Sequence, residues 1–239
     1  FLLSKQNRKT LIVTPTSLIH NWKSEFEKFA PSLSVGISHG LKKERLNIIK
    51  NINDFDVILT TYGSLRNDIE EYEKLHFDYC IIDEAQNIKN PLASSSDAVK
   101  AINASNKFAL TGTPIENNLL ELWSIFDFIM PGYLYSLTKF NAIFIKDPEQ
   151  VENLKRMIKP FILRRTKSQV IKELPPKIEK EFYVEMGKTQ KNTYGIYVEE
   201  IKKRLQEKKD IKNKITIFSY LTKLRQLCLD PSIIVEGYK

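Results

Sequence analysis

An apolar run that ends in two adjacent carboxylates is the feature of this sequence that most limits the possible folds. Cys80, Ile81 and Ile82 are followed directly by Asp83 and Glu84. A continuous apolar run is typical of a strand buried in a parallel sheet, and open α/β sheets bind ligands just beyond the carboxyl ends of their strands. The pattern therefore predicts a phosphate site at this point, where the first acid would orient Mg²⁺ and the second would position or deprotonate an attacking water.

The two acids also have a simpler, purely structural explanation, in which they stabilise the start of a helix. Carboxylates are common in the first turn of a helix, because they interact favourably with the exposed N–H groups there. Two nearby features favour a functional site instead. Gln86 completes a four-residue box with the acids, and the next predicted strand closes with Thr-Gly-Thr-Pro at residues 111–114.

Short apolar segments alternate with helical patterns through the first 114 residues. After Pro15, Thr16 or Ser17 can cap a helix that Pro31 ends. The apolar positions predicted for this helix are Leu18, Trp22, Phe26 and Phe29. Strands alternating with helices indicate an α/β fold with a doubly wound parallel sheet. The predicted strands cover residues 10–14, 34–38, 56–61, 79–83 and 107–111.

The pattern after residue 114 is mainly helical. A helix is predicted over residues 118–130, and a basic helical region follows it as far as Pro175. Residues 178–184 alternate between apolar and polar, which predicts a half-exposed edge strand that returns to the sheet. Two more helices are predicted over residues 189–209 and 214–229.

Basic charge is concentrated in the last third of the chain. Residues 1–150 hold 16 basic and 18 acidic residues, whereas residues 151–239 hold 21 and 11. Such asymmetry is typical of a surface that binds a polyanion, because neutralising phosphates releases condensed counterions. A lysine-rich, solvated helical surface would give the same count, so charge alone leaves the two interpretations open.

Composition excludes several other classes of protein. The two cysteines, Cys80 in a predicted strand and Cys228 in a predicted helix, are expected to be reduced core thiols of an intracellular protein. None of the three histidines has neighbours that would make a metal site. The sequence has no signal-peptide pattern at its start and no run of about 18 apolar residues, so a soluble protein is expected.

Seven blocks of sequence occur in a fixed order between residues 10 and 232. They are LIVTPTSL (11–18), ILTTY (58–62), DEAQNIKN (83–90), LTGTPIEN (110–117), LWSIFDF (122–128), LRRTK (163–167) and LRQLC (224–228). Together they resemble the SNF2 (Swi2/Snf2) family of DNA-dependent ATPases within helicase superfamily 2. One acidic box would be weak support, whereas seven blocks in the right order are difficult to explain by chance.

The resemblance implies a RecA-like fold of the P-loop NTPase type with an inserted helical protrusion. Residues 1–130 would form the core of the first motor lobe, and residues 131–177 would form the protrusion. Residues 178–239 would hold the returning edge strand and the C-terminal helices that lead towards a second lobe. In such motors ATP sits between two lobes, and lobe closure moves duplex DNA, usually without separating its strands.

The resemblance also implies roles for the acidic box and for the turn after the next strand. Asp83 would hold Mg²⁺, the only metal position expected, and Glu84 would activate water. The remaining residues would sense the nucleotide and relay its state to the DNA side: Gln86, Thr111, Gly112 and Thr113.

Contacts to a DNA strand are implied for two other blocks. The residues concerned are Pro15, Thr16 and Ser17 at a helix N-terminus and Thr60, Thr61 and Tyr62. Helix N-termini and hydroxyls suit phosphate oxygens, so binding to double-stranded DNA would be largely independent of sequence. For Tyr62 the residues leave core packing and backbone contact equally open, and Trp22 and Trp123 fit a core better than a stacking platform.

Three cations beside an apolar run form the last candidate contact. Arg164, Arg165 and Lys167 follow residues 161–163, Phe-Ile-Leu. They could be ordinary surface charges, but their clustering favours a contact to phosphate or to a second lobe.

One essential part of such an ATPase has no counterpart in the sequence. The sequence does contain Gly187-Lys188-Thr189, but in the wrong context, and no glycine-rich loop that would cradle the phosphates ends in Gly-Lys-Ser or Gly-Lys-Thr. The chain is therefore expected to be a fragment, monomeric and itself inactive, from a parent ATPase that uses ATP and Mg²⁺. No cofactor is expected on the fragment.

Other interpretations stay open. The basic last third could be an autonomous nucleic-acid-binding or protein-docking module, with the sheet as its scaffold. An RNA helicase of the same superfamily is disfavoured by Thr-Gly-Thr-Pro and by the blocks after it. The Lys, Asn and Ile bias and the compact segment before residue 163 favour a bacterial source weakly. The expected location is the cytoplasm, on the nucleoid in bacteria, or the nucleus in a eukaryote.

Overall fold

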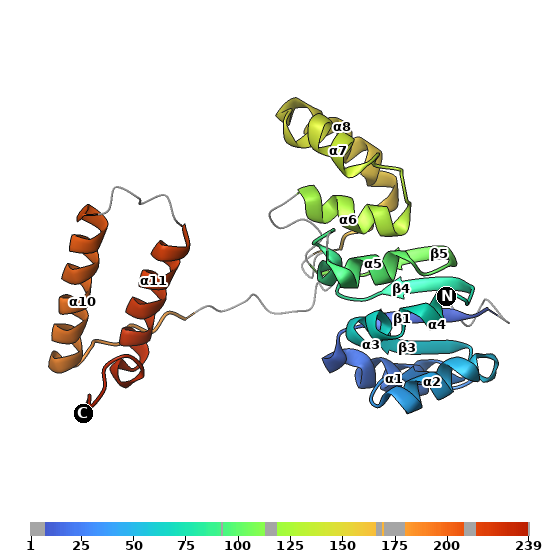
Figure 1. Cartoon of the computed structure of the whole chain (residues 1–239), viewed down its shortest axis with the longest axis horizontal. Helices are drawn as coiled ribbons and strands as arrows, with labels where there is room; N and C mark the ends of the chain where they lie inside the picture. Colours follow the sequence, from blue (N-terminus) through green and yellow to red (C-terminus); the bar gives the residue numbers. More distant parts are fainter. Residues whose placement is uncertain are drawn as a thin grey trace. The chain divides into compact units, whose positions relative to one another are not determined.

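The computed structural model describes residues 8–91, 93–112, 119–165, 169, 180–207 and 214–238 (Figure 1). The chain divides into two compact units, Phe1–Arg164 and Arg165–Lys239.

A parallel sheet forms the centre of the first unit. Its five strands are β1 (Thr10–Thr14), β2 (Val35–Ser38), β3 (Val57–Thr61), β4 (Phe77–Ile82) and β5 (Ala104–Ala109). Their order is β2-β3-β1-β4-β5, and every neighbouring pair is parallel. The predicted α/β class and the five predicted strands are confirmed, with strand ends displaced by no more than three residues.

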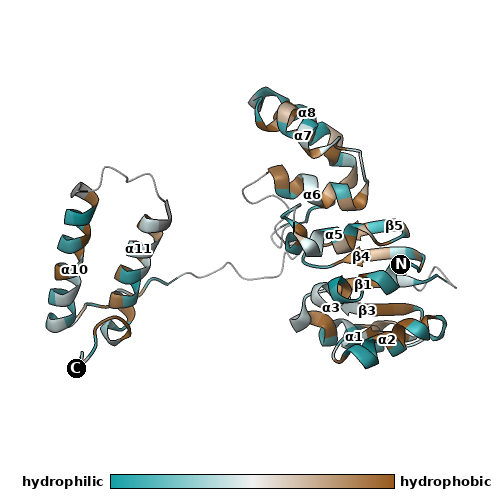
Figure 2. Ribbon diagram, viewed as in Figure 1, coloured by the Kyte–Doolittle hydropathy of each residue, from teal (hydrophilic) through white to brown (hydrophobic). Residues whose placement is uncertain are grey.

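Helices cover both faces of this sheet. They are α1 (Ile19–Phe29), α2 (Lys42–Lys50), α3 (Tyr62–Asn67), α4 (Ile69–Tyr72), α5 (Ser94–Lys100) and α6 (Leu119–Ile129). Strand β1 shows why an unbroken apolar run is needed, because all five of its residues are buried. Leu11 and Val13 pack into the core that contains α3 and α5, whereas Ile12 packs with Ile19 and Phe26 of α1 on the opposite face. Figure 2 shows β1 and β3 as mostly hydrophobic.

The first helix begins differently from the sequence prediction. A 3₁₀ turn, Thr16–Leu18, leads directly into α1, and neither Thr16 nor Ser17 makes a side-chain cap hydrogen bond. Pro15 precedes the turn in an extended conformation. Phe29, predicted on the apolar face, is the last residue of α1 and is 64% exposed.

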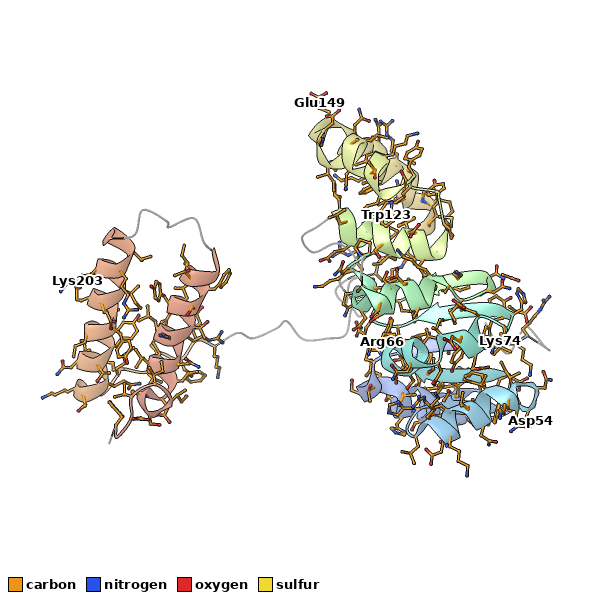
Figure 3. All side chains as sticks on the ribbon, viewed as in Figure 1. Asp54, Arg66, Lys74, Trp123, Glu149 and Lys203 are labelled. Carbon is orange, nitrogen blue, oxygen red and sulfur yellow. The ribbon has the colours of Figure 1, made fainter. Side chains whose placement is uncertain are left out.

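A helical region with its own apolar cluster follows α6. It contains α7 (Leu137–Phe140), a π-helical turn (Asn141–Ile145) and α8 (Val151–Ile158). Trp123 of α6 packs in this cluster and donates to the carbonyl oxygen of Tyr135 at 3.1 Å (Figure 3). The expectation that Trp123 is a core residue is confirmed.

Two helices make up most of the second unit. They are α10 (Lys188–Glu207) and α11 (Lys214–Leu229), and the side-chain amide of Gln190 joins them by donating to the carbonyl oxygens of Leu227 and Cys228. Both predicted C-terminal helices are confirmed.

The predicted edge strand over residues 178–184 is wrong for the part of it that the structure describes. Residues 180–187 adopt no regular structure, and Phe182, Tyr183 and Val184 are 85–90% exposed. Alternation of apolar and polar residues predicts a strand only where a neighbouring strand supplies backbone hydrogen bonds. Residues 178 and 179 lie outside the described range.

The two cysteines also differ from each other. Cys80 is fully buried in β4, as predicted, whereas Cys228 is exposed on α11 and is not a core thiol. Among the described residues no helix is long and apolar enough to span a bilayer.

We expect the two thiols to react at very different rates. Burial raises the pKa of the Cys80 thiol to about 12, and its side chain has no access to solvent. An aromatic disulfide reagent at pH 8 should therefore label one thiol of the folded chain rapidly and the second only on unfolding. Replacing Cys228 with Ser should remove the rapid phase. Rapid reaction of both thiols in the folded chain would contradict this placement of Cys80.

A buried ion pair fixes α2 to the α3–α4 turn. The guanidinium of Arg45 donates to both carboxylate oxygens of Asp68 at 2.5 and 2.9 Å, and these side chains are 10% and 1% exposed. Asp68→Asn would leave the buried cation without its counter-charge, so urea denaturation should show a loss of about 3 kcal/mol. The control is Glu152→Gln, which removes the exposed pair with Lys155 and should cost under about 1 kcal/mol. Equal losses would contradict the account.

Candidate active site

Strand β4 carries the acidic box to the carboxyl edge of the sheet. The backbone N–H of Asp83 donates to the carbonyl oxygen of Val13 at 2.8 Å, so the residue is still hydrogen-bonded to β1 when the strand itself has ended. The chain then turns sharply. Glu84 has a left-handed conformation with φ of 51°, and a 3₁₀ turn, Ala85–Ile88, follows it. A non-glycine residue in this conformation is uncommon and is often associated with function.

The carboxylate of Asp83 is held at both oxygens. Trp22 of α1 donates its indole N–H to Oδ2 at 2.8 Å, and the backbone N–H of Glu84 donates to Oδ1 at 2.8 Å. The carbonyl oxygen of Asp83 accepts from the hydroxyl of Tyr62 at 2.6 Å. All four polar groups of Asp83 therefore have a protein partner, and its position is fixed from three separate segments of the chain.

A chain of hydrogen bonds joins the second acid to the next strand. The side-chain amide of Gln86 donates to Oε2 of Glu84 at 2.7 Å, and its oxygen accepts from the hydroxyl of Thr111 at 3.0 Å. The backbone supports this arrangement, because Ala85 donates to the carbonyl oxygen of Leu110 at 2.9 Å. The structure thus brings together Asp83, Glu84, Gln86 and Thr111, and their roles stay predictions.

Gly112 is the last described residue of this turn. Gly112 is exposed, and a Cβ placed on it would meet no atom of the described residues within 4 Å. Thr113 lies outside the described residues, and its role stays a prediction.

Asp83 has the chemistry that Mg²⁺ requires. A carboxylate offers about four lone-pair sites, and two of those on Asp83 are taken by N–H donors. Within the described part of the chain no cluster of three or more His, Cys, Asp or Glu could form a metal centre of its own. Nucleotide-bound Mg²⁺ takes one or two carboxylates together with phosphate oxygens and waters, so a single ordered aspartate fits that mode of binding.

Tyr62 is an internal residue rather than a surface contact. Its side chain is 8% exposed, and burial together with the nearby carboxylate of Asp83 raises the pKa of its phenol above the usual range. The hydroxyl consequently stays protonated and remains a donor to Asp83 at any physiological pH. The side chain of Tyr62 therefore packs in the core, and a contact of this residue with DNA stays a prediction.

The other predicted DNA contacts are divided between surface and interior. Thr16 and Ser17 are exposed at the start of the helix, and Pro15 beside them is partly exposed. Thr60 and Thr61 are buried, and their hydroxyls donate to the carbonyl oxygen of Ser38 at 3.0 Å and to the hydroxyl of Ser64 at 3.0 Å. Their side chains therefore do not face solvent, and a DNA contact at this position could come only from the backbone.

The basic cluster after the protrusion is only partly described. Arg164 and Arg165 are exposed, at the boundary between the two units. Lys167 lies outside the described residues. Contact of these three cations with phosphate stays a prediction.

Trp22 is the residue that the sequence analysis missed. Its spacing in the helix predicted a core side chain, and it does pack beside Phe26 with ring centroids 6.1 Å apart. Its bond to Asp83 joins residues 61 positions apart. No local pattern carries that information, because the contact arises only when α1 is placed beside the carboxyl end of β4.

Solved structures of known proteins are similar to this chain in fold and in sequence. A *Sulfolobus solfataricus* SWI2/SNF2 ATPase core in complex with double-stranded DNA matches with a TM-score of 0.65 and 37% identity, over 99% of this chain and 51% of that one. A Sulfolobus solfataricus SWI2/SNF2 ATPase core domain gives a TM-score of 0.61 and 37% identity, over 99% of this chain and 49% of that one.

Relatives occur in both bacteria and eukaryotes. A protein named as an ATP-dependent helicase from *Mycoplasma pneumoniae* is 41% identical over 97% of this chain and 22% of its own length. The TATA-binding protein-associated factor MOT1 of *Saccharomyces cerevisiae* is 38% identical over 95% of this chain and 13% of its own. The chain thus spans about a fifth or less of these relatives. The model of the SNF2-related domain matches residues 3–233, and the chain belongs to this family of ATPase domains.

Proposed function

We propose that this chain is the first motor lobe of an SNF2-type, ATP-dependent translocase that moves along duplex DNA and remodels protein–DNA complexes. The observation that carries the proposal is the hydrogen-bonded chain Glu84–Gln86–Thr111 beside the fixed carboxylate of Asp83. Family membership supports the ATPase class, and one similar solved structure is a complex with double-stranded DNA. The protein would act wherever chromosomal DNA lies, in the bacterial cytoplasm or in the nucleus.

Each residue of the box has a distinct task in this proposal. Asp83 would supply a rigid oxygen ligand for Mg²⁺, which neutralises charge on the phosphates of ATP when both are bound. Glu84 would orient and deprotonate the attacking water. Its carboxylate is held by Gln86, and Gln86 is held by Thr111, so a change at the turn after β5 would alter the orientation of the base.

The phosphate-binding groups would come from outside these 239 residues. They must reach the carboxyl ends of β4 and β5, where the box lies. Strand β5 is at one end of the described sheet, and Phe108 and Leu110 beside the box are each 43% exposed. We propose that the segment presenting the phosphate loop packs against this edge.

Binding to DNA would use the backbone of the duplex. Thr16 and Ser17 offer exposed hydroxyls at the start of α1, and Arg164 and Arg165 offer exposed cations. Such groups contact phosphates and carry no sequence information. The alternative function is a basic nucleic-acid-binding or protein-docking module without catalysis, for which the charge of the last third is the supporting observation.

Glu84→Gln should abolish hydrolysis in the full-length protein that carries this chain. Removing a general base typically lowers the rate by about 10²- to 10⁴-fold, and ATP binding should persist because the amide keeps the shape of the side chain. Phosphate release with and without linear duplex DNA measures the effect, with Glu152→Gln as the control carboxylate on α8. The proposal would be contradicted if duplex DNA did not change the hydrolysis rate of the full-length protein. It would also be contradicted if the Glu84→Gln variant hydrolysed ATP as fast as wild type.

The 239-residue chain by itself should show no DNA-stimulated hydrolysis. It has the acids but no glycine-rich Lys-Ser or Lys-Thr loop to present the phosphates. The same phosphate-release assay applies. Turnover by the isolated chain that disappears in Glu84→Gln would show that the missing groups are not needed.

Affinity for duplex DNA should fall steeply with salt. If at least three phosphates are neutralised, raising monovalent salt from about 50 to about 200 mM should weaken binding at least about tenfold, for two unrelated sequences alike. Fluorescence anisotropy with a labelled duplex measures this. Replacing Arg164 and Arg165 with Gln should reduce the salt dependence, whereas Lys50→Gln, at the far end of α2, should not. Salt-independent affinity would favour the protein-docking alternative.

A further inference from the structure

Trp22 occupies an unusual position for a residue that its helix places in the core. Its ring is partly buried beside Phe26, yet its one polar atom lies 2.8 Å from Oδ2 of Asp83. An indole N–H can only donate, and a carboxylate can only accept, so this pair has one possible direction. The indole N–H of Trp22 fixes the rotation of the Asp83 carboxylate and uses one of its lone pairs, so other lone pairs remain available to a metal ion.

The helix that carries Trp22 starts at a predicted DNA contact. The 3₁₀ turn with Thr16 and Ser17 runs directly into α1 without an intervening loop. At about 1.5–2 Å of rise per residue, Trp22 lies roughly 10 Å along the same helical segment from the exposed hydroxyls. A rigid element therefore joins that turn to Asp83.

A second segment reaches Asp83 in the same way. Helix α3 begins at Tyr62, immediately after Thr60 and Thr61, and the Tyr62 hydroxyl donates to the carbonyl oxygen of Asp83 at 2.6 Å. Each of the two segments predicted to contact DNA therefore donates one hydrogen bond to Asp83. Tyr62 holds the backbone of Asp83, whereas Trp22 holds its carboxylate.

We propose that Trp22 is a positioning residue for the Asp83 carboxylate, and that it links the turn at Thr16 and Ser17 to the acidic box. The inference rests on the proposed function, because it gives Asp83 the task of holding Mg²⁺. Groups that orient metal ligands typically change metal affinity or activity about 10- to 100-fold when they are removed. In this proposal Trp22 acts through Asp83, to which its indole N–H donates.

Trp22→Phe tests the indole donor while keeping an aromatic ring in the apolar contact. In the full-length protein this variant should need at least about tenfold more Mg²⁺ for half-maximal DNA-stimulated hydrolysis. The matched control is Trp123→Phe, because Trp123 also donates an indole N–H, to the carbonyl oxygen of Tyr135 in the cluster of α6 and α8. The control should keep the wild-type Mg²⁺ dependence. A purely packing role for Trp22 would lower the denaturation midpoint without moving that dependence, which would overturn the proposal.

A spectroscopic measurement tests the contact without any turnover. Trp22 and Trp123 are the only two tryptophans, so the Trp123→Phe chain of 239 residues gives a single indole ¹H–¹⁵N resonance. Asp83→Asn replaces the charged acceptor and should shift this resonance and speed its hydrogen exchange. Asp78→Asn is the matched control, since Asp78 lies on the same strand but bonds Arg8 and Lys9. It should leave the resonance in place.

The two measurements separate the inference from the function on which it rests. If full-length wild type shows no DNA-stimulated hydrolysis, the proposed function fails, and the resonance still decides whether Trp22 binds Asp83. If wild type is active and Trp22→Phe has the same Mg²⁺ dependence, the positioning role is overturned. A resonance that Asp83→Asn does not move overturns the contact itself.

Discussion

The site depends on how one residue at the end of a buried strand is held. Asp83 directly follows β4, and its backbone N–H still donates to Val13 of β1. Its carboxylate accepts from Trp22 and from the N–H of Glu84, and its carbonyl oxygen accepts from Tyr62. These bonds bring α1 and α3 to the carboxyl edge of the sheet. The chain turns sharply at Glu84, and the carboxylate of this second acid is joined to Thr111 through Gln86.

The sheet supplies the rigidity that this arrangement needs. Strands β3, β1 and β4 lie side by side in parallel register, so their carboxyl ends meet at one edge. Buried apolar residues on both faces fix β1 between two layers of helix. A functional group at the end of such a strand can be held within a narrow range of positions, which is what catalysis by electrostatic placement demands.

Most of the fold could be read from the sequence, because apolar runs and helical spacing are local signals. The strands, the two C-terminal helices and the residues of the acidic box were predicted on that basis. The contacts of Trp22 and the burial of Thr60 and Thr61 could not be, since they depend on which elements become neighbours. The prediction of an edge strand over residues 178–184 was wrong for a related reason. A strand needs a neighbouring strand to hydrogen-bond with, and the alternation of apolar and polar residues does not show whether such a neighbour exists.

The most direct test of the account is the position of the metal in the full-length protein. A crystal structure with a non-hydrolysable ATP analogue and Mn²⁺ in place of Mg²⁺ would locate the ion by its anomalous scattering. The account predicts a peak bonded to the Asp83 carboxylate directly or through one water, with the indole of Trp22 still donating to that carboxylate. A metal bound elsewhere, with Asp83 making only its internal hydrogen bonds, would contradict it.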